Sequence, residues 1–178
     1  MREALPMRLQ ISGEHHPETA RVLLNLGALE AADGDLNGAL KHYRQGLAVL
    51  EERMGRNHIS TAFAVQRLAE FARELGNSDI AISWYTRALA IRRDQLRPDH
   101  PDIATTLLGL ALAELQLDQP DRAVPHLSEA LTIRRRAFGE NHPYTALTAL
   151  LLGLLQWQRG AHPEATPLFR ASTTAYTR

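Results

Sequence analysis

Apolar and small residues recur along the chain at an interval of 42 residues. One column of the recurrence holds Ala20, Ala62, Ala104 and Ala146, and the column six positions later holds Leu26, Leu68, Leu110 and Leu152. Residues at helical spacing share one face, so each segment predicts a helix with a buried side. A fixed interval of about 20 to 50 residues indicates stacked repeats, each of which buries its apolar face against its neighbours.

Two columns of small residues predict that the helices form close pairs. The first column is Gly27, Ala69, Ala111 and Gly153, and the second, twelve positions later, is Ala39, Ala81, Ala123 and Ala165. Four residues after the second column stand the large apolar residues Tyr43, Tyr85, Leu127 and Phe169. We expect each of these large side chains to press where the first helix offers little or no side chain.

This pattern places first helices at 17–32, 60–75, 101–117 and 143–159, and second helices at 36–54, 78–96, 120–138 and 163–176. Pro17, Pro101 and Pro143 fit the first turn of a helix, where no amide hydrogen is needed. Gly34, Gly76 and Gly160 fit the turn inside each pair, because glycine adopts left-handed conformations readily. Arginines such as Arg92 and Arg134 gather near the ends of second helices, which we interpret as solvated, dipole-matched ends.

The columns resemble the tetratricopeptide repeat motif, in which a bulky residue precedes leucine and a small residue, and an alanine and an aromatic follow in the second helix. The 42-residue length and the His-Pro junction resemble the variant found in kinesin light chains and in many bacterial regulators. The resemblance implies an all-α fold, a right-handed α-solenoid of antiparallel helix pairs. The chain departs from the motif three residues after the first small column, where it has Glu30, Ala72, Glu114 and Gln156.

The recurrence divides the chain into repeats at 16–57, 58–99, 100–141 and 142–178, which we expect to form one continuous domain. Residues 3–17 align with 129–143 without a gap, so residues 1–15 are expected to be the second helix of a truncated preceding repeat. The chain is therefore expected to be a segment of a longer repeat protein.

Composition favours a soluble protein that binds other proteins. Twenty basic residues balance 20 acidic ones, so the clustered positive field that nucleic acid requires is not expected. No leader peptide and no apolar stretch long enough to cross a membrane are found, so cytoplasmic localisation is expected. Lys41 is the only lysine among the 20 basic residues, a bias typical of a GC-rich bacterial genome.

No motif in the chain predicts catalysis, a cofactor or a metal. Asp33 to Gly38 matches the first half of a calcium loop, but Arg44 occupies the position of the required glutamate, so a structural turn is the better interpretation. His16, His58, His100 and His142 are interpreted as capping or packing residues at the junctions between repeats, and His42 and His126 as packed or solvated.

The remaining candidate site is a surface. In tetratricopeptide arrays the first helices usually line a concave groove, and the resemblance places a partner-binding surface at set positions around the first small column. The expected partner-binding residues are Leu24, Asn25, Phe63, Gln66, Arg67, Glu70, Arg73, Leu108, Leu112, Leu115, Leu147, Leu150, Leu154 and Trp157. Trp157 is the expected anchor, and Arg67, Glu70 and Arg73 are expected to set the register of the ligand. Alternatively, the leucines only pack against neighbouring helices.

Three hypotheses for function follow. The first is a non-catalytic scaffold that binds a peptide or helical segment of a protein in its groove. The second is a sensory or autoinhibitory region of a larger bacterial signalling enzyme, such as a kinase or a nucleotide-driven switch. The third is self-association through uncapped ends or through the apolar fourth repeat.

Overall fold

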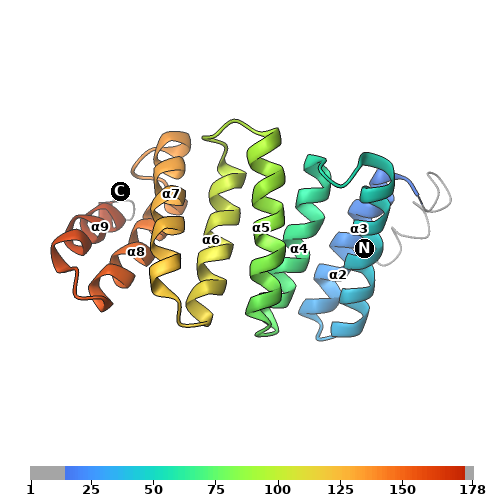
Figure 1. Ribbon diagram of the computed structural model, residues 1–178, viewed down its shortest axis with the longest axis horizontal. Helices are drawn as coiled ribbons and strands as arrows, with labels where there is room; N and C mark the ends of the chain where they lie inside the picture. Colours follow the sequence, from blue (N-terminus) through green and yellow to red (C-terminus); the bar gives the residue numbers. More distant parts are fainter. Residues whose placement is uncertain (1–14, 175–178) are drawn as a thin grey trace. The chain divides into compact units, whose positions relative to one another are not determined.

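The computed structural model describes residues 15–174, and this part of the chain contains eight α-helices and no strands (Figure 1). The helices are α2 (Pro17–Ala32), α3 (Leu36–Met54), α4 (Ile59–Glu74), α5 (Ser78–Gln95), α6 (Pro101–Gln116), α7 (Pro120–Phe138), α8 (Pro143–Gln158) and α9 (His162–Thr174). The helix bounds differ from the predicted ones by at most one residue, apart from the last helix, which is described only as far as Thr174. The predicted all-α fold of helix pairs is confirmed.

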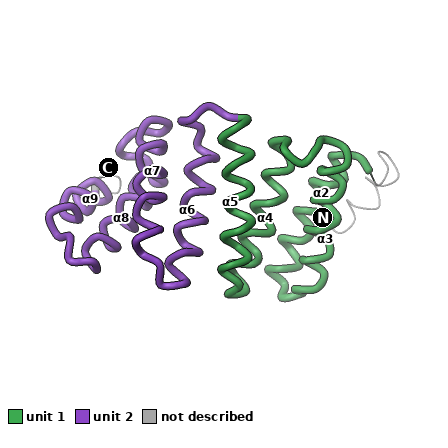
Figure 2. Tube along the Cα trace, viewed as in Figure 1, with its two compact units in different colours: residues 1–95 green, residues 96–178 purple. Residues whose placement is uncertain are grey.

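Two compact units divide the helices between them (Figure 2). Residues 1–95 contain the hairpins α2–α3 and α4–α5, and residues 96–178 contain the hairpins α6–α7 and α8–α9. Within the first unit α4 packs against both α3 and α2, and within the second unit α8 packs against α7. The division into four repeats of one continuous domain stays a prediction, and the helix expected at 1–15 falls almost wholly outside the described residues.

Close packing inside a hairpin depends on the small residues, as predicted. A Cβ atom added to Gly27 in α2 would lie 3.0 Å from two ring carbons of Tyr43 in α3. A Cβ atom on Gly153 in α8 would lie 3.0 Å from Cε1 of Phe169 in α9. The missing side chain therefore makes the space that the aromatic ring of the second helix fills.

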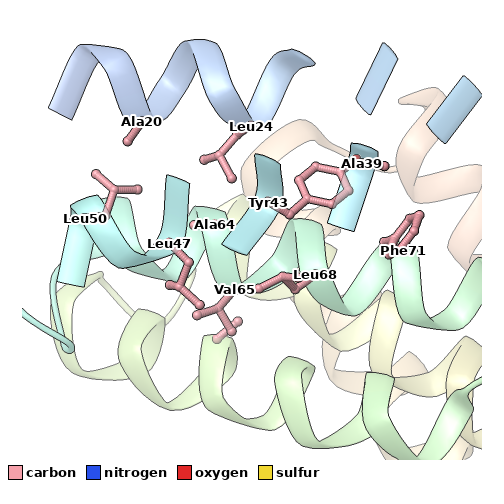
Figure 3. Close-up of a cluster of buried hydrophobic side chains, with 11 residues drawn as sticks. Ala20, Leu24, Ala39, Tyr43, Leu47, Leu50, Ala64, Val65, Leu68 and Phe71 are labelled. Carbon is pink, nitrogen blue, oxygen red and sulfur yellow. The ribbon is translucent and has the colours of Figure 1, made fainter. Parts of the chain in front are cut away.

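The core of the first unit lies among α2, α3 and α4 (Figure 3). Leu24 of α2, Leu47 of α3 and Val65 of α4 are each at most 8% exposed in this cluster. Tyr43 and Phe71 meet edge to face, with ring centroids 5.5 Å apart. Full burial of such side chains stabilises the fold by roughly 1.5–3 kcal/mol each, so stacking of hairpins rather than helix propensity holds the unit together.

The turn inside the first hairpin is structural, as expected for the segment that resembles half of a calcium loop. Gly34 has a positive φ of 86°, and the carboxylate Oδ1 of Asp35 accepts a hydrogen bond from the Gly38 amide at 2.9 Å. Asp35 is therefore the N-cap of α3. In the third hairpin the left-handed position is taken by Asp118, whose φ is 55°.

The interpretation of the arginines as solvated helix ends is wrong for Arg92, which is 4% exposed, and for Arg134. Its side chain is only 5% exposed, and its Nη1 donates to the Tyr144 carbonyl at 3.1 Å and to Oγ1 of Thr148 at 2.6 Å. Burial lowers the pKa of this guanidinium from its usual value. Arg134 therefore ties α7 to α8 rather than facing water.

Candidate interaction surface

The histidine junctions are helix caps. His16, His58, His100 and His142 are the N-caps of α2, α4, α6 and α8. In each junction Nδ1 accepts a hydrogen bond from the backbone N–H two residues later, at 3.1–3.2 Å. This use of the imidazole confirms the predicted capping role. Among the described residues, no group of three or more metal-ligating side chains is found.

Leu24 on α2 is buried, which corrects its expected place on an open surface. The side chain is 1% exposed because it packs against Gly46 of α3. A Cβ atom added to Gly46 would lie only 2.9 Å from Leu24 Cγ. Its neighbour Asn25 is only partly exposed. A partner would therefore reach little of α2 through these two residues.

The polar residues of α4 bind one another. Arg67 Nη1 donates to Glu70 Oε2 at 3.0 Å, and its guanidinium lies 5.0 Å from the centre of the Phe63 ring. Gln66 is 8% exposed, because it donates to Glu70 Oε1 at 2.8 Å and accepts from Arg92 of α5, which corrects its expected accessibility. Much of the charge expected to set the register of a ligand is thus already paired.

A pocket of about 310 Å³ lies beside Phe63 at the N-terminal ends of α2 and α4. Its lining consists of Pro17, Glu18, Arg21, Leu24, Leu50, Ser60 and Phe63. Phe63 is 38% exposed, whereas Leu24 and Leu50 are buried and form an apolar floor. The pocket can accept one apolar side chain, and neither α2 nor α4 carries a longer row of exposed large apolar residues.

The leucines of α6 are partly buried. Leu108 and Leu115 pack against a core cluster that includes Ala149, Leu152 and Leu155 of α8. Leu112 lies between them on the same face and is also partly exposed. At these two positions the predicted surface is therefore part of the packing around a core to which α6, α7 and α8 all contribute.

On α8 the predicted residues form an exposed apolar stripe. Leu147, Leu150, Leu154 and Trp157 are 42%, 37%, 47% and 51% exposed. On the opposite side of the helix, Ala149, Leu152 and Leu155 lie in the core. Because α8 is apolar on both sides, this stripe, hereafter the α8 stripe, is the part of the predicted surface most available to a partner.

Trp157 is held in place by its own hairpin. Its ring centroid lies 4.1 Å from that of His162 and 6.2 Å from that of Phe169, both in α9. One part of the indole is therefore packed while about half of the residue faces solvent. A preorganised aromatic ring of this kind loses little conformational entropy on binding, which suits an anchor.

The sequence interpretation missed two carboxylate–imidazole pairs inside hairpins. Glu30 Oε2 lies 2.5 Å from His42 Nδ1, and Glu114 Oε2 lies 2.8 Å from His126 Nδ1. Glu114 is fully buried, and its other oxygen lies 3.4 Å from Arg122 Nε. In both pairs the residues are twelve positions apart, and this shared spacing is the signal that could have revealed them. The glutamate of each pair occupies the position at which the repeat motif usually has an aromatic residue.

A second pocket was also not predicted. It lies among α3, α4 and α5 in the first unit, has a volume of about 330 Å³, and is mostly apolar, with Leu68, Phe71 and Trp84 among its lining residues.

No helix within residues 15–174 is both long and apolar enough to cross a membrane.

Comparison with known proteins agrees with this geometry. The sequence profile described as tetratricopeptide repeat matches residues 1–52, 60–136 and 102–178. None of the curated proteins compared with the chain matches it.

Several solved structures share the fold. BtubC (BKLC) from P. vanneervenii is 23% identical with a TM-score of 0.84, over 98% of this chain and 68% of that one. A Podosopora anserina kinesin light chain with nearly identical TPR-like repeats is 20% identical with a TM-score of 0.79, over 98% of this chain and 82% of that one. Aspartyl phosphate phosphatase F from Bacillus subtilis is 15% identical with a TM-score of 0.83, over 98% of this chain and 44% of that one. With the profile matching most of its length, the chain belongs to the tetratricopeptide repeat family and resembles the kinesin-light-chain type.

Proposed function

We propose that this chain is a non-catalytic scaffold that binds a peptide or helical segment of a protein through its first helices. Tetratricopeptide repeats generally mediate protein–protein interactions, and the fold is typically a non-catalytic scaffold. The observation that carries the proposal is the α8 stripe, four large apolar side chains in one row that are each more than a third exposed. Contiguous exposed apolar side chains are a feature of protein interaction sites.

The α8 stripe supplies affinity in the proposal, and Trp157 is its anchor. Tryptophan is among the residues that contribute most to binding energy at protein interfaces. Leu112 of α6 is included in the proposed surface because it lies on the equivalent face and remains partly exposed. Helix α8 has no charged residue between Pro143 and Gln158, so an apolar segment docks there without desolvating a charge.

The first unit contributes a separate contact in the proposal, at Phe63 and its pocket. Arg67 and Arg73 of α4 remain partly exposed and supply hydrogen-bond donors beside it. Because Arg67 is already paired with Glu70, its effect on affinity is expected to be small, and its contribution is to orientation.

The proposal is tested by replacing Leu112, Leu154 and Trp157 together with serine. Affinity capture with the parent protein identifies a partner, and titration of the purified partner then measures the dissociation constant. A matched control replaces Leu29, Leu36 and Leu75, which are 42%, 45% and 41% exposed, with serine. The expected result is loss of binding in the first variant only, with helicity preserved in both. Equal affinity of the first variant and the parent would refute the assigned surface.

The alternative, a sensory or autoinhibitory region of a larger bacterial signalling enzyme, uses the same surface with an intramolecular ligand. The likeness to the Bacillus subtilis phosphatase, of which this chain spans less than half, concerns the fold. The open reading frame that encodes this chain tests the alternative. A catalytic domain in the same reading frame would support it, whereas a reading frame of repeats alone would remove it.

A further inference from the structure

The pocket among α3, α4 and α5 has the size and the lining of a small-molecule site. Its volume of about 330 Å³ falls at the lower end of the range of roughly 300–1,000 Å³ that such sites occupy. Leu47, Leu68 and Phe71, which are labelled in Figure 3, line it and are each at most 8% exposed. None of its lining residues belongs to the α8 stripe or to the pocket beside Phe63.

The sequence of the second hairpin departs from its neighbours at this pocket. The first and third hairpins have the carboxylate–imidazole pairs described above, in which the two residues are twelve positions apart. The second hairpin has Ala72 and Trp84 at the same two positions, and both residues line the pocket. An alanine and an indole therefore provide an apolar wall where the other two hairpins have an ion pair.

The one carboxylate in the lining is already neutralised. Glu51 Oε1 accepts a hydrogen bond from Arg87 Nη2 at 2.5 Å and lies 3.8 Å from Arg56 Nε. The charge of Glu51 is therefore offset by two guanidinium groups, and the pocket does not favour a cationic ligand.

The one cation in the lining is available to a ligand. Arg44 is exposed, and its guanidinium makes no hydrogen bond or ion pair with another residue in the part of the chain that the structure describes. A guanidinium has a planar fork of donors that matches the two oxygens of a carboxylate. The pocket thus combines an apolar interior with one unpaired positive charge.

We propose that this pocket binds a small molecule that consists of a planar aromatic ring system and one carboxylate. The ring contacts Phe71 and Trp84, since aromatic side chains pack well against other aromatic rings, and Arg44 pairs with the carboxylate. The inference goes beyond the proposed function, because no residue of the pocket belongs to the predicted partner-binding surface.

The probe that tests the charge requirement is naphthoate, a fused aromatic ring system with one carboxylate, titrated into the chain in a calorimeter. The expected dissociation constant is about 1 mM or lower, as is usual for a ligand of this size. Naphthamide, the uncharged amide of the same ring, is expected to bind at least about 10-fold more weakly, because the charge-assisted hydrogen bonds are lost. No binding of naphthoate, or equal binding of the two probes, would overturn the proposal.

The substitution Arg44→Ser tests the assigned cation, and serine is the residue at the equivalent position of the third hairpin, Ser128. The dissociation constant of naphthoate should rise at least about 10-fold, whereas that of naphthamide should not change. The matched control is Arg170→Ser, which removes an exposed arginine from the equivalent position of the fourth hairpin and should leave both constants unchanged. Equal affinity of Arg44→Ser and the parent for naphthoate would overturn the proposal.

The double substitution Ala72→Glu with Trp84→His tests the pocket itself, because it gives the second hairpin the pair that the first and third hairpins already use. Binding of both probes should be lost while the helicity measured by circular dichroism is kept. A folded double variant that binds naphthoate as tightly as the parent would overturn the proposal. If the double variant unfolds, the result for Arg44→Ser decides, since that exposed position carries no packing.

A peptide that ends in phenylalanine presents a ring and a carboxylate too, so a blocked peptide of this kind is the competing probe. Tighter binding of the peptide than of naphthoate would overturn the assignment to a small molecule. Failure of this inference is distinguishable from failure of the proposed function, because Arg44→Ser is expected to leave the affinity for a protein bound at the α8 stripe unchanged.

Discussion

Gly27 and Tyr43 are in contact across the first hairpin, with room for no further carbon between them, since an added Cβ would lie 3.0 Å from the ring. The substitution Gly27→Ala gains about 1 kcal/mol of helix propensity and costs roughly 1–3 kcal/mol in overpacking. The expected net effect is a loss of about 1 kcal/mol in the free energy of unfolding, measured by urea denaturation.

A double-mutant cycle isolates this contact. Leu127 stands opposite Ala111 in the third hairpin, so Gly27→Ala combined with Tyr43→Leu recreates a pair that the fold already uses. The alanine is expected to cost less in the Tyr43→Leu background, by about 1 kcal/mol. Equal costs in the two backgrounds would show that the Tyr43 ring is not what excludes the methyl group.

The junction histidines are expected to contribute stability as caps. Because Nδ1 of His58 accepts from the Ser60 amide at 3.1 Å, His58→Ala should lower the free energy of unfolding by about 1 kcal/mol. His58→Asn should restore most of the loss, because the asparagine side chain also accepts hydrogen bonds at an N-cap. If both variants lose the same stability, packing of the ring rather than capping accounts for the histidine.

Stability is expected to fall at alkaline pH because of Tyr85. Burial raises the pKa of its phenol from 10.0 to about 12, despite a hydrogen bond with Arg73 that acts in the opposite direction. The folded state therefore keeps the proton after the unfolded state loses it, so the contribution is complete below pH 10 and is lost as the pH rises to about 12. The shift corresponds to about 2–3 kcal/mol, measured by urea denaturation across that pH window.

The control for this alkaline transition is Tyr85→Phe, which should lose stability less steeply above pH 10. If Tyr85→Phe and the parent lose stability identically as the pH rises, groups other than Tyr85 cause the loss.

The buried carboxylate of Glu114 is expected to contribute stability through His126 and Arg122. Glu114→Ala removes the carboxylate from a site that is 0% exposed and should cost about 2–3 kcal/mol. The fourth hairpin has Gln156 and Leu168 at the equivalent positions, so Glu114→Gln with His126→Leu should cost less than Glu114→Ala. A double variant as unstable as Glu114→Ala would show that the third hairpin requires the ion pair itself.

Helix positions could be predicted from the sequence because they depend on local signals. Prolines and histidines begin the first helices, and a left-handed residue ends them, so the bounds of α2 and α3 were predicted without error. The contact between Gly27 and Tyr43 followed from the same columns, since partners inside a hairpin are separated by a constant number of residues.

The accessibility of the surface could not be predicted in the same way. Leu24 and Leu150 occupy the same column, yet one is 1% exposed and the other 37%. The difference arises because Leu24 is covered by residues of another helix, and the sequence around a leucine does not specify what covers it. The pairs formed by Glu30 and by Glu114 were missed because each column was interpreted separately from the column that it contacts.

The central claim is that a protein covers the α8 stripe when the chain functions. Oxidative footprinting of side chains tests it directly, by comparing the assembled protein from its source organism with the isolated chain at low concentration. The expected result is slower oxidation of Leu154 and Trp157 in the assembly, with Leu29 unchanged. Protection of other surfaces, with Leu154 and Trp157 oxidised as fast as in the isolated chain, would contradict the account.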